Sequence, residues 1–247
     1  MVNVHIHRFA ADGAPDDPET VRFFHAQWTI YQKLVDANVL RHREIAQLIH
    51  EALNARFMGA FTFLDIACGD ASLAKRALEG TRVARYHGVD LAMPAIEFAA
   101  ANLDGVPYEV DLDYRDYAAD LAERALRADA VWCGLSMHHL DTDAKLRVMR
   151  EIRALIAPGG LFMLYEPTLA DGETRADYMR RIRPYVLSEW VMLSGEELAQ
   201  ILEHIETCDL PETSESWISL GRSAGFSQGQ EVYAVPGGVF RVYRFLP

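Results

Sequence analysis

Residues 64–71 (LDIACGDA) have the composition of a ligand-binding turn. They join a short apolar run, AFTFLDI, to a helix-like run, SLAKRAL, through small residues. Small residues let the backbone approach a ligand closely, and the N-terminus of the following helix then points at that ligand. We expect Gly69 to tolerate change least. Asp70 makes the turn acidic, which favours a ligand that carries positive charge.

Further carboxylates follow the next two predicted strands. Asp90 ends the strand RYHGVD, about 20 residues beyond the turn, where a carboxylate accepts hydrogen bonds from ribose hydroxyls. A third strand closes with Asp111, Leu112 and Asp113. A nicotinamide dinucleotide is the rival ligand, but its pyrophosphate requires the spacing G-x-G-x-x-G. This turn has one glycine, so it suits a cationic cofactor better.

Polar residues also recur on a predicted helix near the N-terminus. Apolar residues at three- and four-residue steps predict one long helix over residues 19–55. Asn38 and His42 follow Tyr31 by 7 and 11 residues, nearly whole helical turns, so all three share one face. This face either donates hydrogen bonds to the cofactor or substrate, or it is a buried polar trio bonded to backbone.

Two histidines follow the fourth predicted strand of the chain. His138 and His139 lie at the end of the sheet where ligands bind, and histidine titrates near neutral pH. One of them is a candidate general base, and the alternative is that one packs in the core while the other caps a helix. Glu166 ends the next strand and is a candidate to accept a substrate proton or to hold an ammonium group, or it is a structural hydrogen-bond acceptor.

A local reversal of charge marks residues 168–216. Two interpretations stay open: a clamp for a carboxylate or phosphate on the substrate, or a solvated helix face. Among the residues concerned, Tyr178 and Arg181 are our candidates for substrate binding. The arginines and tyrosines of this stretch are Arg175, Arg180, Arg181, Arg183, Tyr178 and Tyr185.

Strands alternate with helices along residues 60–167, and most of the strands are apolar throughout. This pattern predicts an α/β fold with a parallel sheet covered on both faces. We predict a single domain over residues 1–247, with a helical cover at 19–55, a core at 60–167 and a helical insertion at 168–216. A terminal helix and an antiparallel hairpin follow at 217–247, and residues 1–18 form a loose arm or a short edge strand.

Composition excludes several classes of protein. The net charge of −12 disfavours nonspecific binding of nucleic acid or of anionic membrane. Three cysteines far apart fit a reducing cytosol, and neither a signal peptide nor a membrane span is indicated. We therefore expect a cytoplasmic protein, monomeric or homodimeric. The stretch HIETCDLPET fits no strong metal site, so we predict no metal.

The ordered landmarks resemble the class I S-adenosylmethionine-dependent methyltransferases. Residues 65–71 are similar to the first motif of that family, residues 135–140 (LSMHHL) to its fourth-strand motif and residues 157–160 (APGG) to the turn before its fifth strand. Ala67 and Ala71 depart from the family, which often has glycine there. Alanine at these positions suggests a turn that avoids positive φ.

The resemblance implies a Rossmann-like, mostly parallel sheet of seven strands and S-adenosyl-L-methionine as cofactor. It assigns the methionine end to the first turn, the ribose to Asp90, the adenine to residues 111–113 and the sulfonium to Ser136. The implied cofactor-binding residues are Tyr31, Asp65, Ala67, Cys68, Gly69, Asp90, Leu91, Asp111, Leu112, Asp113 and Ser136. The substrate-binding candidates are Asn38, His42, Tyr178 and Arg181, and the catalytic candidates are His138, His139 and Glu166.

These expectations lead to methyl transfer to an O or N atom of a small molecule. The helical cover and the insertion flank the predicted site, and an enclosed pocket favours a metabolite over a macromolecule. Two alternatives remain. A noncatalytic module would bind the adenosyl cofactor but lack an enclosed substrate cavity. A protein or RNA methyltransferase would have a basic surface or an asparagine-proline type of fourth motif, and this chain has neither.

Overall fold

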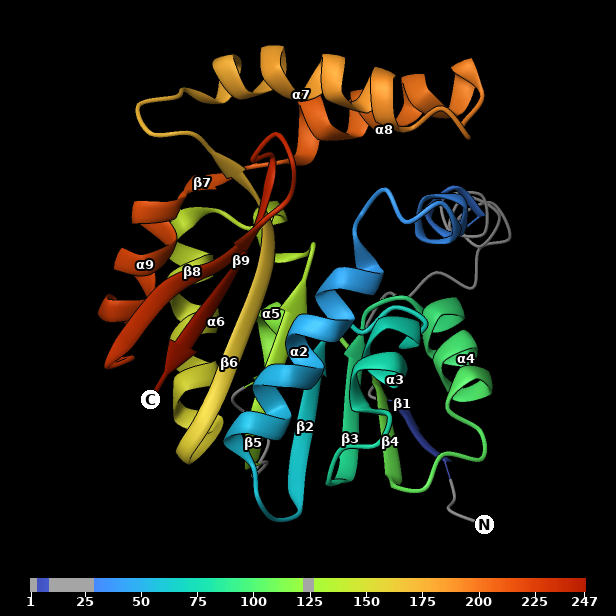
Figure 1. Ribbon diagram of the computed structural model, residues 1–247, viewed down its shortest axis with the longest axis vertical. Coiled ribbons are helices and arrows are strands. Elements are labelled where there is room, and N and C mark those ends of the chain that lie inside the picture. Colours follow the sequence, from blue (N-terminus) through green and yellow to red (C-terminus); the bar gives the residue numbers. More distant parts are fainter. Residues whose placement is uncertain (1–3, 9–28, 122–126) are drawn as a thin grey trace.

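A computed structural model describes residues 4–8, 29–121 and 127–247, which fold into a sheet with helices on both faces (Figure 1). The strands are β1 (Val4–Arg8), β2 (Phe61–Ile66), β3 (Val83–Asp90), β4 (Glu109–Tyr114), β5 (Ala128–Gly134), β6 (Ile156–Leu169), β7 (Glu212–Thr213), β8 (Gln228–Ala234) and β9 (Phe240–Leu246). The helices are α2 (His42–Arg56), α3 (Ser72–Leu78), α4 (Met93–Asn102), α5 (Tyr117–Asp120), α6 (Thr142–Leu155), α7 (Arg175–Glu189), α8 (Gly195–Cys208) and α9 (Ser214–Ser223), with a 3-10 turn η2 (Met137–His139).

The order of the strands places the first turn in the middle of the sheet. The order is β1-β4-β3-β2-β5-β6-β9-β8, and β7 pairs with the end of β6. Neighbours from β1 to β6 are parallel, whereas β9 is antiparallel to both β6 and β8. The chain runs outward from β2 to β4 and then returns to β5 on the other side of β2. Sheets of this type bind ligands at such a reversal, beyond the carboxyl ends of the strands.

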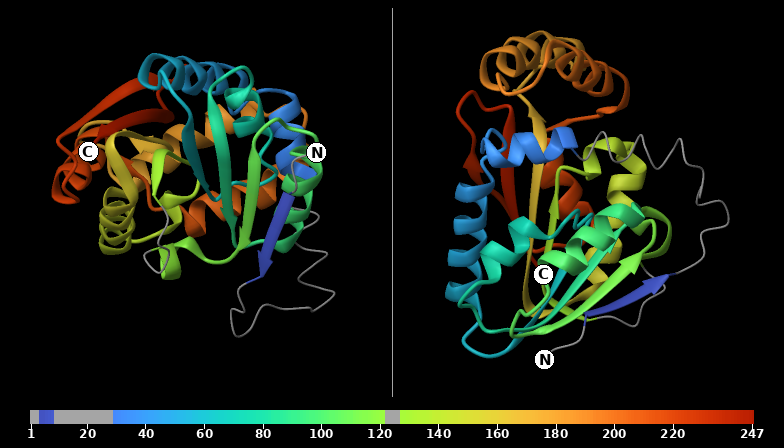
Figure 2. Two further views of the ribbon diagram at one scale, coloured as in Figure 1. Left: turned by 90° about the horizontal axis from the view of Figure 1, so that it is seen from below. Right: turned by 90° about the vertical axis from the view of Figure 1, so that its right-hand side faces the viewer.

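The predicted α/β class, the parallel core and the terminal hairpin are confirmed. The predicted number of seven strands is too small, because β1 adds a parallel edge strand beside β4 and β7 adds a short pairing to β6 (Figure 2). The edge strand within residues 1–18 was one of the two forms expected there. The sequence could not predict its pairing with β4, because the residues of Val4–Arg8 do not indicate which strand they join.

The central strands are apolar because both faces of the sheet are covered. Side chains of α2, α3 and α4, such as Ile45, Ala74 and Ile96, form one core with one face of the sheet. Side chains of α6 and α9, such as Val148 and Trp217, form a second core on the other face. These cores fix the strands, so side chains at the strand ends have defined positions.

The prediction of one continuous helix across the N-terminal cover is wrong for the described part. Residues 29–36 are helical, a turn follows at 37–40, and α2 begins at His42. Asn38 and Arg41 have φ values of 58° and 55°, a left-handed conformation that no α-helix contains. The apolar periodicity continues across this break, which is why the sequence pattern did not reveal it. Residues 19–28 lie outside the described residues.

The predicted helical insertion forms α7 and α8, which lie side by side beyond the edge where the parallel strands end (Figure 1). Each helix begins with a capping box, Thr174 with Asp177 and Ser194 with Glu197. Because β6 leads into α7 and β7 pairs with β6 after α8, the insertion is fixed to the sheet at both ends.

None of the helices in the described residues combines the length and the apolar character that a membrane-spanning helix requires.

Gly160 determines how closely the start of β6 packs against the start of β5. A Cβ atom there would lie 2.6 Å from the backbone oxygen of Asp129 and 2.4 Å from Cγ2 of Ile156. We expect Gly160→Ala to lower the free energy of unfolding by about 1–3 kcal/mol, because backbone cannot yield as a side chain can. Gly59→Ala is the matched control, since a Cβ there meets nothing within 4 Å. Urea unfolding of both variants measures this, and equal stabilities would contradict the steric argument.

Candidate active site

The turn after β2 is built from left-handed residues. Ala67, Gly69 and Ala71 have φ values of 55°, 55° and 58°. The prediction that alanine at positions 67 and 71 marks a turn without positive φ is therefore wrong. Alanine in this conformation costs roughly 1–3 kcal/mol per residue and persists only where surrounding structure enforces it. Leu135, across the switch point, has a φ of 53°, so strained backbone lines both sides of the predicted site.

The Asp90 carboxylate holds this turn against the end of β3. Its Oδ2 accepts a hydrogen bond from Gly69 N at 2.9 Å, and its Oδ1 accepts one from Ala92 N at 2.9 Å. Cys68 N adds a bond to Val89 O at 3.0 Å. Burial raises the pKa of Asp90, and these backbone donors oppose that rise. The carboxylate for which we predicted ribose binding therefore also holds the backbone of the turn in place.

Asp65 is buried at the end of β2 and accepts a hydrogen bond from the Tyr86 hydroxyl at 2.7 Å. Burial raises the pKa of Asp65 to about 7, and the charges of Asp90 and Asp70 add to the rise. The Tyr86 bond acts in the opposite direction. A buried acid of this kind gains stability when a cation binds beside it, because the cation compensates the desolvation of the carboxylate.

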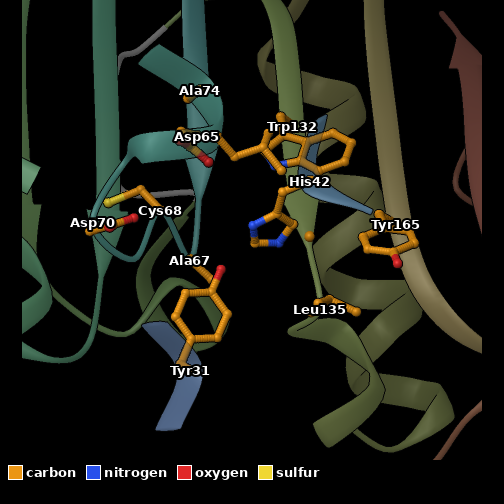
Figure 3. A pocket seen from close by; sticks show the side chains of 12 residues that line it. Tyr31, His42, Asp65, Ala67, Cys68, Asp70, Ala74, Trp132, Leu135 and Tyr165 are labelled. Carbon is orange, nitrogen blue, oxygen red and sulfur yellow. The ribbon is translucent and has the colours of Figure 1, made fainter. Parts of the chain in front are cut away.

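A cavity opens above the turn (Figure 3). In Figure 3 the His42 ring lies between Tyr31, Trp132 and Tyr165, and Asp65 and Asp70 lie on the side of the turn. Tyr31 and His42 meet with ring centroids 5.8 Å apart although the helix between them is broken. The lining residues are Tyr31, His42, Asp65, Ala67, Cys68, Asp70, Leu73, Ala74, Trp132, Gly134, Leu135 and Tyr165.

His42 is the buried polar group at the centre of this cavity. Its side chain comes from the first turn of α2, and its Nδ1 has no hydrogen-bond partner within the described residues. Burial lowers the pKa of His42 to about 4, against the opposing effect of Asp70. A neutral imidazole with a free nitrogen therefore faces the space above the turn, where it can bond a polar group of a ligand.

A second cavity of about 210 Å³ adjoins the first and shares Tyr31 and Leu135 with it. Most of its wall is apolar and comes from residues 29–40, α7 and α8, while imidazoles and a carboxylate occupy one part. It is lined by Ile30, Tyr31, Leu34, Leu40, Leu135, His138, His139, Pro167, Ile182, Trp190, Ile201, His204, Ile205, Asp209 and Phe240.

Glu166 is fully buried and lines neither cavity. Its carboxylate accepts hydrogen bonds from Met137 N at 2.8 Å and from His138 Nδ1 at 2.6 Å, with longer bonds from Ser136 N and His138 N. Glu166 therefore fixes the turn after β5 and orients His138. Direct contact with a substrate, which we predicted for Glu166, has no support in this geometry.

His138 and His139 both line the second cavity, as the sequence led us to expect for groups near a substrate. The His138 ring is buried, and the attraction of Glu166 raises its pKa although desolvation opposes this. His139 is more exposed, and desolvation lowers its pKa to about 3, with the neighbouring His138 and His204 adding to the effect. The raised pKa favours the protonated form of His138, whereas the lowered pKa favours the neutral form of His139.

The residues predicted for the adenine line neither cavity. Asp113 is buried and pairs with His87 Nε2 at 3.2 Å and Arg115 Nε at 3.7 Å, while Leu112 packs beneath Gly88. Asp111 lies near His7 and Arg85. Leu91 follows Asp90 and is exposed. Ser136 contacts the Tyr117 hydroxyl at 2.9 Å. Their cofactor-binding roles stay predictions.

Three of the substrate-binding candidates contact other residues of this chain. Asn38 bonds Glu44 and Arg43 N at the start of α2, and Tyr178 is buried under Arg181. Arg181 forms two bonds to Glu173 and one to Thr168 O. The other arginines of α7 also donate hydrogen bonds to carbonyl or carboxylate groups of this chain. Only His42 among these candidates lines a cavity.

Several lining residues were missed from sequence. Trp132 and Tyr165 face the first cavity, and Trp190 and Phe240 face the second. Inside apolar strands and helices, such residues have the signature of core packing and no signal of their own. Asp209 belonged to a stretch noted for its His and Cys residues, and only the fold brings it beside His138 and His139.

Residues 64–162 match a family model described as a methyltransferase domain. This segment is a methyltransferase domain of the class I, S-adenosylmethionine-dependent type. The match confirms the resemblance drawn from the turn, Asp90 and the later motifs. Comparison with the curated proteins gives no match to this chain.

Solved methyltransferases share the fold. An O-methyltransferase family protein from Burkholderia thailandensis has a TM-score of 0.62 and 17% identity, over 85% of this chain and 57% of that one. A Nostoc punctiforme protein described as an O-methyltransferase has a TM-score of 0.61 and 20% identity, over 96% and 63%. Human N-acetylserotonin methyltransferase, solved in complex with SAM, has a TM-score of 0.57 and 16% identity, over 95% and 60%.

This chain spans between half and two thirds of the length of the first structures that it matches. At these identities the likeness concerns the fold, and the residues of the site are this chain's own.

Removal of the Asp90 carboxylate tests its double role in the turn after β2. We expect Asp90→Ala to raise the dissociation constant of S-adenosylhomocysteine at least about tenfold and to lower the melting temperature, because Gly69 N and Ala92 N lose their acceptor. Asp90→Asn keeps one oxygen acceptor and is the control for the backbone bonds. Calorimetric titration and thermal unfolding measure both effects, and wild-type affinity in Asp90→Ala would refute a ligand role.

Asp65 predicts a pH dependence of cofactor binding. Its pKa of about 7 means that the free protein holds a neutral carboxyl below pH 7. The ammonium group of S-adenosylhomocysteine prefers the ionised form, so we expect the affinity to fall as the pH drops from 8 to about 5.5. Asp65→Asn removes the titrating group and is expected to give weak, pH-independent binding over that range. An unchanged wild-type affinity across this range would contradict the assignment.

Proposed function

We propose that this protein transfers a methyl group from S-adenosylmethionine to an oxygen atom of a small, largely apolar molecule. The main support for this proposal is that two neighbouring cavities share Tyr31 and Leu135 as lining residues. One has an acidic turn that suits a cationic donor, and the other has an apolar wall with imidazoles. Two molecules bound in these cavities would therefore face each other across the shared residues.

The donor side is supported by the charges around the turn. Asp65, Asp70 and Asp90 lie close enough to raise the pKa of the Tyr31 hydroxyl electrostatically, in addition to the larger effect of burial. When bound, S-adenosylmethionine supplies a methyl group that is already activated by a sulfonium. These carboxylates favour its positive charges, and the left-handed turn with Gly69 lets the backbone approach its methionine end.

The acceptor side favours oxygen over nitrogen. His138 and His139 face a cavity whose other lining residues are mostly apolar. A hydroxyl acceptor needs a group that takes its proton, and an imidazole nitrogen can do so. Such proton transfer contributes about 10²–10⁴-fold, while alignment of acceptor and donor contributes up to roughly 7–11 kcal/mol. Two of the related folds are described as O-methyltransferases, which agrees with this choice.

The second cavity weakens the main alternative, a noncatalytic module that only binds the adenosyl cofactor. Such a module needs no space for a second molecule beside the cofactor, whereas this cavity adjoins the donor cavity and has polar groups at a defined place.

Obstruction of the acceptor cavity tests the proposal. The wild-type protein is incubated with S-adenosylmethionine and a panel of apolar phenols, alcohols, carboxylic acids and amines, and methylated products are detected by mass spectrometry. We expect turnover of a hydroxyl compound. Ile201→Trp fills the cavity and is expected to abolish turnover while S-adenosylhomocysteine binds within about twofold of wild type.

Val191→Trp is the control, because Val191 is 75% exposed and lies outside both cavities. Wild-type turnover in Ile201→Trp would show that the acceptor binds elsewhere. Product only from amines would overturn the choice of oxygen, and cofactor binding with no product from any compound would favour the noncatalytic module.

A further inference from the structure

The imidazoles of the second cavity form a cluster with one carboxylate. Ligand atoms of His138, His139 and Asp209 all lie within 4.8 Å of one another. Asp209 Oδ1 is 3.6 Å from His138 Nε2 and 3.7 Å from His139 Nδ1. These distances are too long for hydrogen bonds. They are close to the separation of about 3.4 Å between two ligands of one tetrahedral ion with bond lengths near 2.1 Å.

Glu166 orients one imidazole of this cluster toward Asp209. Its carboxylate accepts bonds from three backbone N–H groups, so its bond with His138 Nδ1 at 2.6 Å has the ring nitrogen as donor. In the neutral ring, Nε2 then carries a lone pair and faces Asp209. This carboxylate–histidine arrangement is the one that fixes the tautomer of metal-binding histidines.

Asp209 supplies an independent observation. Its side chain is 6% exposed, and its Oδ1 has no hydrogen-bond partner within the described residues. Most buried carboxylate oxygens are hydrogen-bonded, because an unpaired one has lost its hydration without replacement. Two imidazole nitrogens face this oxygen, and none of the three atoms reaches another. A cation between them would bind all three.

The backbone around the cluster is fixed before any ion binds. Leu210 N donates to His138 O at 2.7 Å, and Arg175 Nε donates to Asp209 O at 2.7 Å. The end of α8 is thereby held against η2, although 70 residues separate them in the chain. Only small side-chain shifts are needed to bring three ligands to one ion.

We propose that His138, His139 and Asp209 bind one divalent transition-metal ion. Two imidazoles and a carboxylate suit the borderline ions Zn²⁺, Co²⁺ and Fe²⁺ better than Mg²⁺ or Ca²⁺, which prefer oxygen ligands. This site revises the expectation of no metal drawn from residue spacing. His204 lies next to the cluster, with its ring centroid 5.1 Å from that of His139.

The position of the ion would give it a role toward the acceptor. All three ligands line the second cavity, so an open coordination position faces the space in which we place the acceptor. An ion there would bind an acceptor oxygen and hold it in place. This role rests on the proposed function, whereas metal binding itself does not.

Titration with Co²⁺ tests the site in the absence of donor and acceptor. Protein without a polyhistidine tag is stripped with a chelator, and binding is followed by calorimetry and by the visible absorption of the bound ion. We expect one equivalent to bind. Asp209→Asn and His139→Gln should each weaken binding at least about tenfold, with circular dichroism and melting temperature showing that the fold is retained.

Histidines elsewhere provide matched controls. His7→Gln changes the exposed strand β1, and His50→Gln changes α2, and both are expected to keep wild-type Co²⁺ affinity. The proposal is overturned if wild-type protein binds no Co²⁺, which would make the cluster an imidazolium between two carboxylates. It is also overturned if Asp209→Asn and His139→Gln both bind as tightly as wild type. Neither outcome affects methyl transfer, which the acceptor panel measures separately.

Discussion

The hydrogen bond from Gly69 N to the Asp90 carboxylate is the contact on which the donor side depends. It joins the turn after β2 to the end of β3, two strands that the sheet already holds in register. The turn contains alanines at positive φ, a conformation that local preferences oppose. Tertiary contacts therefore enforce the shape, and a backbone held in this way is preorganised for a ligand.

Glu166 plays a comparable part on the other side of the switch point. A carboxylate without exposure to water is costly unless several donors replace its hydration. Here three backbone N–H groups and the His138 ring do so, and in return the carboxylate fixes the path of the chain after β5. The same interaction orients His138 toward Asp209, while Leu135, which lines both cavities, donates its own backbone N–H to Tyr165 O at 2.7 Å.

The two cavities differ in their electrostatics. The first has the carboxylates of Asp65 and Asp70 on one side, whereas the second joins an apolar wall to imidazoles and the carboxylate of Asp209. Burial affects the titrating groups in opposite directions, because it raises the pKa of Asp65 to about 7 and lowers that of His42 to about 4. A cationic donor and a neutral acceptor would each meet the environment that favours them. The shared residue Tyr31 comes from the N-terminal cover, which thus contributes to both.

The sequence by itself determined the order of strands and helices, the turn around Gly69 and the place of Asp90, because these features depend on local periodicity and on spacing along one β-α unit. Only the tertiary structure decided which side chains face the cavities. The hydrogen bond from the Tyr165 hydroxyl to Leu40 O in the break, and the burial of Asp113 against His87, join residues of distant elements. Trp132 and Asp209 reach the site for the same reason, since long-range pairing of strands and docking of α8 leave no pattern in the residues that they bring together.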